Sequence, residues 1–262
     1  MNEASEQLSF WDHLDVLRAA LLKIAAVAVL FSIVAFIFKD KLFEIVLAPK
    51  DGEFITYRLL AGIGALTGKQ ADKAFSVQLI NTGLAEQFII LMKTALCAGV
   101  LCASPYILYQ IFRFVSPALY VDERRYALKV AGGGYIMFIL GVLISYYLIF
   151  PLTFRFLGIY QVSGDVSNMI TLQSYISTLI LMSLSMGLVF EMPVVCWLFG
   201  KLGLLDAQFM RRYRRHAIVI IPIVAAIITP TSDIFTLLAV SLPMWALYEV
   251  SIYLVRRTAE RS

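Results

Sequence analysis

Long apolar runs, each followed by a shorter polar or charged segment, recur from one end of this chain to the other. A helix needs about 20 such residues to cross the hydrocarbon core of a bilayer. The composition fits this pattern, because 60% of the 262 residues are hydrophobic and only 15% are charged, which is too apolar for a soluble globular domain. We therefore predict an all-α polytopic membrane protein built as a single integral-membrane domain.

Six of these runs are predicted to be transmembrane helices. They lie at residues 19–38, 87–112, 126–150, 169–199, 217–229 and 234–255. The fifth has only thirteen residues and would be about 20 Å long as a helix, against a bilayer core of about 30 Å. We expect a locally thin bilayer there, or a polar flank buried in protein. The longest polar segment, residues 39–86, is interpreted as an extramembrane loop and not as a separate domain.

Basic residues predict how the six helices are oriented. Arginine and lysine are frequent in the links after the second and fourth spans and at the C-terminus, whereas the link after the third span has only Arg155. Cytoplasmic loops carry an excess of these residues, so both termini are predicted to face the cytoplasm. The mixed charges of residues 39–86 do not change this, since long loops follow the rule poorly. Arg211-Arg-Tyr-Arg-Arg215 is interpreted as a topology anchor, with binding of anionic lipid as the alternative.

The patterns of common enzymes are missing from the sequence. It has no GxSxG, no HExxH and no Walker loop, and its only histidines, His13 and His216, lie near different spans. The three cysteines lie inside apolar runs without metal-binding spacing, so neither a disulfide framework nor a metal or other cofactor is predicted. Basic residues form small groups instead of one stripe, which argues against nucleic-acid binding. We predict a protein that is not an enzyme.

Glu191 is unusual because it lies inside the fourth predicted span, two residues before Pro193. A charged carboxylate near a helix centre costs roughly 2.5 to 3.5 kcal/mol on insertion scales, so this one should be protonated, paired or facing a watered concavity. It could be a structural acid held by hydrogen bonds or a functional acid. Lys93 and Glu249 lie nearer to span ends, from which their side chains could snorkel to the interface.

The link at residues 113–125 holds a second group of candidate residues. Pro117 begins a turn, and Asp122-Glu123-Arg124-Arg125 then places two acids and two bases at the mouth of the third predicted span. Charge in such a link is ordinary, because it lies where the aqueous phase meets the membrane.

Short motifs in this link and elsewhere resemble those of one family. They are Ser116-Pro-Ala-Leu-Tyr120 followed by Glu123-Arg-Arg125, the preceding Ser104-Pro-Tyr-Ile-Leu-Tyr-Gln110, Phe190-Glu-Met-Pro193 and His13-Leu-Asp-Val-Leu-Arg18. Their order, their positions at span ends and the short fifth span resemble TatC, a subunit of the twin-arginine protein translocase, over essentially the whole chain. The resemblance implies tilted helices that form a concave cup open sideways to the bilayer.

The resemblance also implies a function. TatC proteins bind twin-arginine signal peptides on folded cargo, and they nucleate a translocation site with single-span TatA-type subunits, powered by the proton-motive force. A TatB-type subunit accompanies some of them. The resemblance therefore implies a receptor and core subunit in a bacterial cytoplasmic (inner) membrane, in contact with lipid and part of a homo- or hetero-oligomer.

Site residues follow from their positions in the family motifs. Glu123 matches the glutamate that contacts the signal, and Phe114 matches the aromatic residue beside that site. Pro49 matches a proline of the first outer loop, and Glu191 matches the intramembrane acid. The predicted signal-peptide site also includes Asp15, Leu119 and Arg125, and the predicted intramembrane and assembly residues also include Lys93 and Asp233.

The chemistry of arginine supports the role of Glu123. A carboxylate accepts two hydrogen bonds from the planar guanidinium fork, which lysine cannot reproduce. One exposed pair contributes only about 0 to 1 kcal/mol, so binding must also use other contacts and burial of the signal's apolar segment in the membrane. Pairing of Glu123 with Arg124 or another loop base is the alternative interpretation.

The chain departs from the family pattern at two positions. Relatives commonly have a glutamate where this chain has Val16, and many have a glutamine where it has Leu237. One residue along a helix is a rotation of about 100°. Either Asp15 or Asp12 compensates for the missing glutamate, or Glu123 carries more of the recognition.

Two other functions stay open at this point. A small proton-coupled solute transporter could use Glu191 and Lys93 as a relay, although the two halves show no inverted repeat. A purely structural assembly scaffold would survive loss of Glu123.

Overall fold

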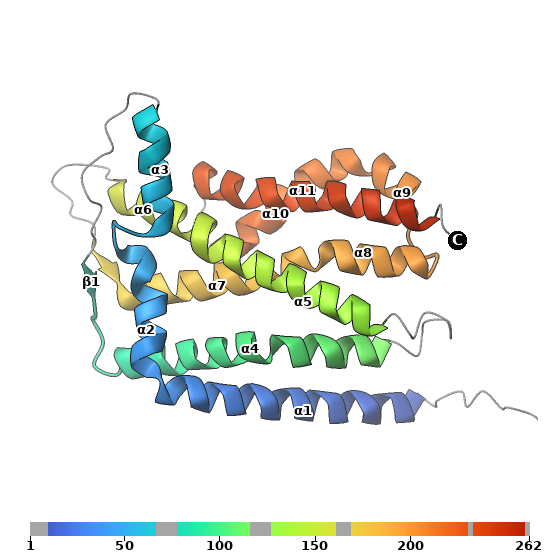
Figure 1. The fold of residues 1–262 in the computed structure, drawn as a ribbon, viewed down its shortest axis with the longest axis horizontal. Helices are drawn as coiled ribbons and strands as arrows, with labels where there is room; N and C mark the ends of the chain where they lie inside the picture. Colours follow the sequence, from blue (N-terminus) through green and yellow to red (C-terminus); the bar gives the residue numbers. More distant parts are fainter. Residues whose placement is uncertain (1–9, 67–77, 116–126, 161–168, 230–232, 260–262) are drawn as a thin grey trace, which may run out of the picture. The chain divides into compact units, whose positions relative to one another are not determined.

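The computed structural model describes residues 10–66, 78–115, 127–160, 169–229 and 233–259, and nearly all of them are helical (Figure 1). The elements are α1 (Phe10–Ile37), α2 (Lys39–Leu47), the 3-10 turn η1 (Ala48–Lys50), α3 (Ile55–Leu66), β1 (Leu79–Ile80), α4 (Glu86–Val115), α5 (Ala127–Ile144), the π-helical turn η4 (Ser145–Ile149), α6 (Phe150–Ile159), β2 (Ile170–Thr171), α7 (Leu172–Phe190), α8 (Met192–Lys201), α9 (Ala207–Arg212), α10 (Arg214–Ile228) and α11 (Ile234–Ala259).

The chain divides into two compact units, and each is described by itself. Unit 1 comprises Met1–Phe38 and Ala95–Tyr135, and therefore contains α1 and most of α4. Unit 2 comprises Lys39–Thr94 and Ile136–Ser262, and contains both short strands and the remaining helices, except for the part of α5 before Ile136, which belongs to unit 1.

In unit 1, α1 and α4 run antiparallel (Figure 1) and meet at Gly99. A Cβ atom added to Gly99 would lie 2.1 Å from the Ser32 hydroxyl oxygen and 2.7 Å from the Ala28 carbonyl oxygen. No side chain fits there, so glycine is what allows the two backbones to approach. Small residues at helix contacts are the usual device in membranes, where apolar side chains gain little by leaving lipid for protein.

In unit 2, α5 and α7 cross at a pair of glycines. A Cβ atom on Gly141 would lie 2.5 Å from the Met186 carbonyl oxygen, and one on Gly187 would lie 2.7 Å from the Phe138 ring. Gly141 of α5 thus leaves room for the backbone of α7, and Gly187 of α7 leaves room for the Phe138 ring of α5. This crossing sets the distance between the two helices.

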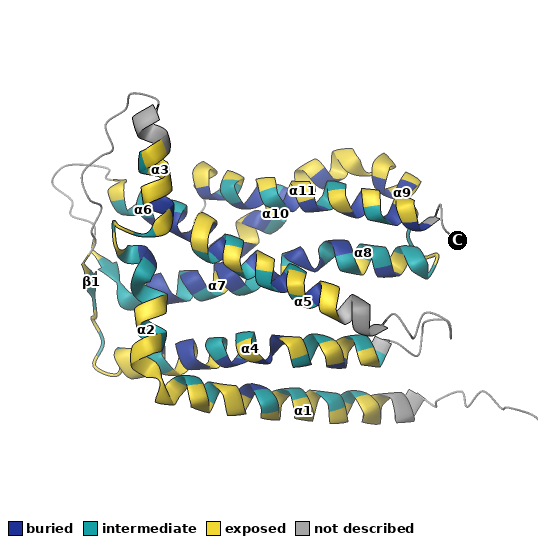
Figure 2. Ribbon diagram, viewed as in Figure 1, coloured by how far each residue is buried: buried dark blue, intermediate teal, exposed yellow. Residues whose placement is uncertain are grey.

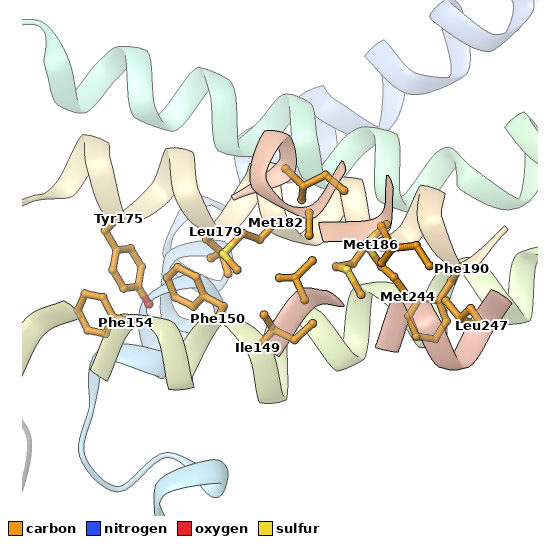
Figure 3. Packing of buried hydrophobic residues seen from close by; sticks show 14 of the residues in the cluster. Ile149, Phe150, Phe154, Tyr175, Leu179, Met182, Met186, Phe190, Met244 and Leu247 are labelled. Carbon is orange, nitrogen blue, oxygen red and sulfur yellow. The ribbon is translucent and has the colours of Figure 1, made fainter. Parts of the chain in front are cut away.

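The main apolar core of unit 2 lies around this crossing. Figure 3 shows aromatic residues and methionines from the third and fourth predicted spans and from α11 packed together. The Tyr175 ring meets Phe150 and Phe154 edge-on, with ring centroids 5.0 and 4.9 Å away. Met182 and Met186 are completely buried.

Among the residues that the structure describes, five helical segments are long and apolar enough to cross a membrane: Leu14–Ile37, Glu86–Phe114, Gly132–Ile159, Leu172–Lys201 and Ile234–Thr258. Figure 2 shows that α1 is the most exposed of these helices, with only 6% of its most apolar window buried, as expected of a helix that faces lipid.

The short fifth predicted span falls within α10 except for its last residue, Thr229, and the 15 residues of α10 would reach about 22 Å. Only Tyr213 separates α10 from α9, so the helical path continues beyond the apolar run. Ala207 and Met210 of α9 are buried against α11. The flank of the short span is thus packed on protein through one face, and a count of six spans stays a prediction.

The segment predicted as an extramembrane loop, residues 39–86, contains regular structure in the parts that are described, 39–66 and 78–86. It contains α2, η1 and α3, and its strand β1 pairs in parallel with β2 through Leu79 opposite Ile170. These helices are short, so tertiary contacts rather than length must stabilise them. Hydropathy gives no signal for such helices.

The glycine crossing can be tested with two alanine substitutions in α5. Gly141→Ala should lower the free energy of unfolding by roughly 1 to 3 kcal/mol because α5 and α7 must move apart. Gly133→Ala is the matched control, since nothing lies within 4 Å of a Cβ atom at that position. Thermal unfolding of the purified variants in detergent measures both, and equal midpoints would contradict the assignment.

Candidate functional site

Two of the predicted signal-site residues lie in the described part of unit 1. Asp15 is exposed near the start of α1, and Phe114 is half-buried in the last turn of α4. The other three, Leu119, Glu123 and Arg125, lie outside the described residues.

The antiparallel packing of unit 1 brings Asp15 and Phe114 to the same end of the helix pair. Asp15 is thirteen residues before Ala28, and Phe114 is fifteen residues after Gly99. Both positions are therefore about 20 Å from the contact between the helices, in the same direction. An acid and an aromatic ring that are far apart in the sequence thus lie at the same end of the helix pair.

Glu191 forms the break between α7 and α8 in unit 2. Its backbone N–H lies 3.1 Å from the Leu188 carbonyl oxygen, and its own carbonyl accepts from Val194 and Val195 at 3.0 and 2.9 Å. The helix breaks here because Pro193, at the start of α8, has no N–H to donate. The proline also fixes the position of the acid along the span.

The side chain of Glu191 is only 7% exposed, and neither carboxylate oxygen has a hydrogen-bond partner in the described part of the chain. The sequence left three possibilities open for this acid: protonation, pairing or contact with water. Pairing with a cation of the chain is not observed among the described residues. A structural role based on hydrogen bonds has no support in these contacts.

The other predicted assembly residues of unit 2 lie in different surroundings. Asp233 accepts a hydrogen bond from the backbone N–H of Thr236 at 2.7 Å and caps the start of α11. Lys93 is exposed on α4. Pro49 is buried in η1.

Pro49 belongs to a segment that is held by side-chain hydroxyls from distant parts of unit 2. Tyr146 donates to the Ile45 carbonyl at 2.6 Å, and Tyr175 donates to the Val46 carbonyl at 3.1 Å. The Tyr57 hydroxyl lies 3.1 Å from the Pro49 carbonyl and 3.0 Å from the Pro151 carbonyl, which share its proton. We call Tyr57, Tyr146 and Tyr175 the tyrosine anchors.

Of the three tyrosine anchors, Tyr57 is the one outside the apolar spans, and it is buried. Burial raises the pKa of its phenol well above the ordinary value, and the nearby Arg155 guanidinium acts in the opposite direction. The guanidinium carbon lies 5.7 Å from the centre of the Tyr57 ring, within the range of a cation–π contact. The phenol therefore stays a hydrogen-bond donor at every physiological pH.

Sequence reasoning missed the tyrosine anchors. Their acceptors are backbone carbonyls 8 to 129 residues away, and a carbonyl leaves no mark in the sequence. A tyrosine at the end of an apolar run is the only available signal, and it is also typical of an ordinary interfacial residue.

The described residues contain no group of three or more His, Cys, Asp or Glu that could hold a metal ion. A cleft of about 530 Å³ lies beside η1 and β1. Its lining mixes aliphatic, amide and charged side chains: Leu47, Lys50, Asp51, Gln78, Leu79, Ile80, Asn81, Gln87 and Leu172. Such a lining has no catalytic constellation.

Comparison with known proteins decides the family. The model of the family described as Sec-independent protein translocase protein (TatC) matches residues 12–243. The chain belongs to the TatC family. Its TatC relative from Blattabacterium sp. (strain BPLAN) is 31% identical over 97% of each chain, and that from Deinococcus radiodurans is 35% identical over 94% of this chain and 85% of the relative.

A solved TatC structure agrees with this membership. The crystal structure of a twin arginine translocase receptor TatC has a TM-score of 0.74 and 31% identity, and the match covers 94% of this chain and 99% of that one. The predicted TatC resemblance and the all-helical polytopic membrane fold are confirmed. The protein is a component of a Sec-independent protein translocase, and its family is a transport family rather than a classical enzyme family.

Replacement of Tyr57 tests the tyrosine anchors of this TatC family member. Tyr57→Phe removes one buried hydroxyl and should speed backbone amide exchange in residues 45–51, because two carbonyls lose their donor. Hydrogen–deuterium exchange measures this directly. Tyr147→Phe is the matched control, since the Tyr147 side chain is exposed and no hydrogen bond of its hydroxyl is recorded. Equal exchange in the two variants would argue against the anchors.

Replacement of Glu191 tests whether that acid is structural. Glu191→Gln should change the free energy of unfolding by less than about 1 kcal/mol, because no hydrogen bond or ion pair of the described chain is lost. Asp233→Ala should lower it by about 1 kcal/mol, because a helix cap is removed. Thermal unfolding in detergent compares them. A larger loss for Glu191→Gln would indicate a structural acid.

Proposed function

We propose that this chain is the signal-peptide receptor and core subunit of a twin-arginine translocase in a bacterial cytoplasmic membrane. It binds the two arginines of the signal at one end of unit 1 and recruits TatA-type, and where present TatB-type, single-span subunits. Transport of folded cargo then uses the proton-motive force.

The observation that carries this proposal is the level shared by Asp15 and Phe114 in unit 1. An exposed carboxylate and a partly exposed ring lie at the same end of the α1–α4 pair. The predicted link at residues 113–125, which contains Leu119, Glu123 and Arg125, overlaps the last three residues of α4 and continues beyond it in the sequence. A guanidinium can bond a carboxylate through two N–H groups and stack on an aromatic face.

The substitution at position 16 supports a particular division of roles. Val16 is 48% exposed next to Asp15, so this chain presents an apolar side chain where relatives commonly present an acid. Asp15 is then the exposed carboxylate of α1 that we assign to one arginine of the signal, and Glu123 is the second proposed acid. Leu14, also exposed, adds apolar surface for the signal's hydrophobic segment.

Unit 2 supplies the residues proposed for assembly. Glu191 offers two buried oxygens without a partner in the described chain, which a polar group of a partner helix can satisfy. The tyrosine anchors fix the segment around Pro49, which gives a partner a rigid surface to contact. Lys93 is exposed and Glu191 is buried, and membership of a protein translocase family favours this function over the solute-transporter alternative.

Photocrosslinking to a signal peptide tests the receptor function. A photoreactive residue at position 16, exposed beside Asp15, or at position 114 should crosslink to a peptide with Arg-Arg and not to one with Lys-Lys. Position 37, exposed at the other end of α1, is the control and should not crosslink. Glu123→Gln and Asp15→Asn should each reduce the yield.

Two outcomes would contradict the receptor function. One is an equal yield with both peptides, and the other is a yield at position 37 that matches position 16. If crosslinks are absent while Glu191→Gln abolishes a proton-coupled solute flux in liposomes, the transporter function replaces it. Full export activity in Glu123→Ala would instead favour the scaffold.

A further inference from the structure

The arginines at the junction of α9 and α10 have no part in the function proposed above. Arg211, Arg212 and Arg215 are exposed, and the structure records no ion pair or hydrogen bond of their side chains within the described chain. Arg214 differs, because it forms an ion pair with Glu249 of α11.

The backbone that carries these arginines is held firmly on α11. Ala207 and Met210 are buried against Ile252 and Val255. The Tyr248 hydroxyl donates to the Met210 carbonyl at 2.7 Å. Together with the Arg214–Glu249 pair, these contacts fix α9 and the start of α10. The exposed arginines therefore project from a preorganised helical corner and not from a loose loop.

An apolar surface adjoins the arginines on both helices. Along α10, exposed aliphatic side chains follow the basic segment: Ile218, Val219, Ile220, Ile223 and Ile227, each more than half exposed. Phe209 and Tyr213 are exposed beside the arginines, with ring centroids 4.5 Å apart. Aromatic rings at this level are typical of the membrane–water interface.

We propose that this corner is a binding site for an anionic phospholipid. The phosphate is held by Arg211, Arg212 and Arg215, and the acyl chains lie along the exposed face of α10. Guanidinium groups bond phosphate oxygens through paired N–H donors. Basic residues at the ends of transmembrane helices are suited to anionic headgroups.

The combined surface selects a lipid over other occupants. A free phosphate would use only the arginines, and an apolar partner helix would use only the isoleucine and valine side chains of α10. A phospholipid would use both surfaces, because its headgroup can contact the arginines while its acyl chains contact the aliphatic side chains that follow them along α10. The site depends only on membrane insertion, so it stands or falls independently of the receptor function.

Native mass spectrometry of the purified chain in detergent tests the site. The wild type should retain phosphatidylglycerol or cardiolipin in preference to phosphatidylcholine. Each arginine near an anionic headgroup contributes to affinity, so Arg211→Gln should weaken binding about fivefold and Arg211→Gln with Arg215→Gln about 25-fold. Binding of phosphatidylcholine should not change.

The control removes the same charge elsewhere in unit 2. Lys39→Gln with Lys41→Gln alters two exposed lysines of α2 and should leave anionic-lipid binding within twofold of the wild type. An equal loss in both double variants would overturn the site in favour of diffuse charge attraction. Unchanged binding of anionic lipid in the double arginine variant would also overturn the site. The exposed face of α10 would then be better explained as a contact for a partner helix.

Two further measurements separate lipid binding from simpler explanations. Glycerol 3-phosphate has the phosphate without acyl chains, and binding as tight as that of the lipid would overturn the acyl-chain contact. Thermal unfolding shows whether the variant is folded: phosphatidylglycerol should raise the midpoint of the wild type more than that of the arginine variant. The two midpoints without lipid should agree.

Discussion

The crossing of α5 and α7 at Gly141 and Gly187 is the contact on which the rest of unit 2 depends. Lipid is as apolar as a leucine side chain, so no hydrophobic force presses these helices together, and close backbone packing must do it. The crossing places η4 and α6 over Tyr175 and Met182 and so encloses the core. A Cβ atom at Gly141 would also touch Phe190, the residue before Glu191. One backbone approach thus sets both the core and the position of the residue that precedes Glu191.

Much of this fold could be predicted because the length of an apolar run is a local property. The second predicted span, 87–112, lies inside α4, and the break of the fourth at Glu191 follows from Pro193. The helices of residues 39–86 could not be predicted, since each is stabilised by contacts with distant segments. The helix before the short apolar run could not be predicted from hydropathy, because the charged residues Arg214 and Arg215 precede that run and yet belong to α10.

The candidate site was predictable to a different degree in each unit. Family motifs indicate that Asp15 and Phe114 belong to one site, but only the antiparallel contact at Gly99 explains how residues so far apart in sequence reach one level. Leu119, Glu123 and Arg125 rest on the motif alone. For Glu191, the cost of burying a charge predicted that the carboxylate is protonated, paired or in contact with water. The structure shows no described residue that pairs with it.

The tyrosine anchors have a consequence for how this part of the chain tolerates change. Every acceptor is a main-chain carbonyl, which all twenty amino acids supply alike, so Ile45 and Val46 can be exchanged without touching the bonds they accept. Each donor, in contrast, depends on one hydroxyl at the tip of one ring. No second substitution at an acceptor position can restore a lost phenol. Residues 45 and 46 can therefore vary without loss of these hydrogen bonds, whereas the tyrosines that donate them cannot. Pairwise covariation would not reveal such a contact between a side chain and a backbone carbonyl.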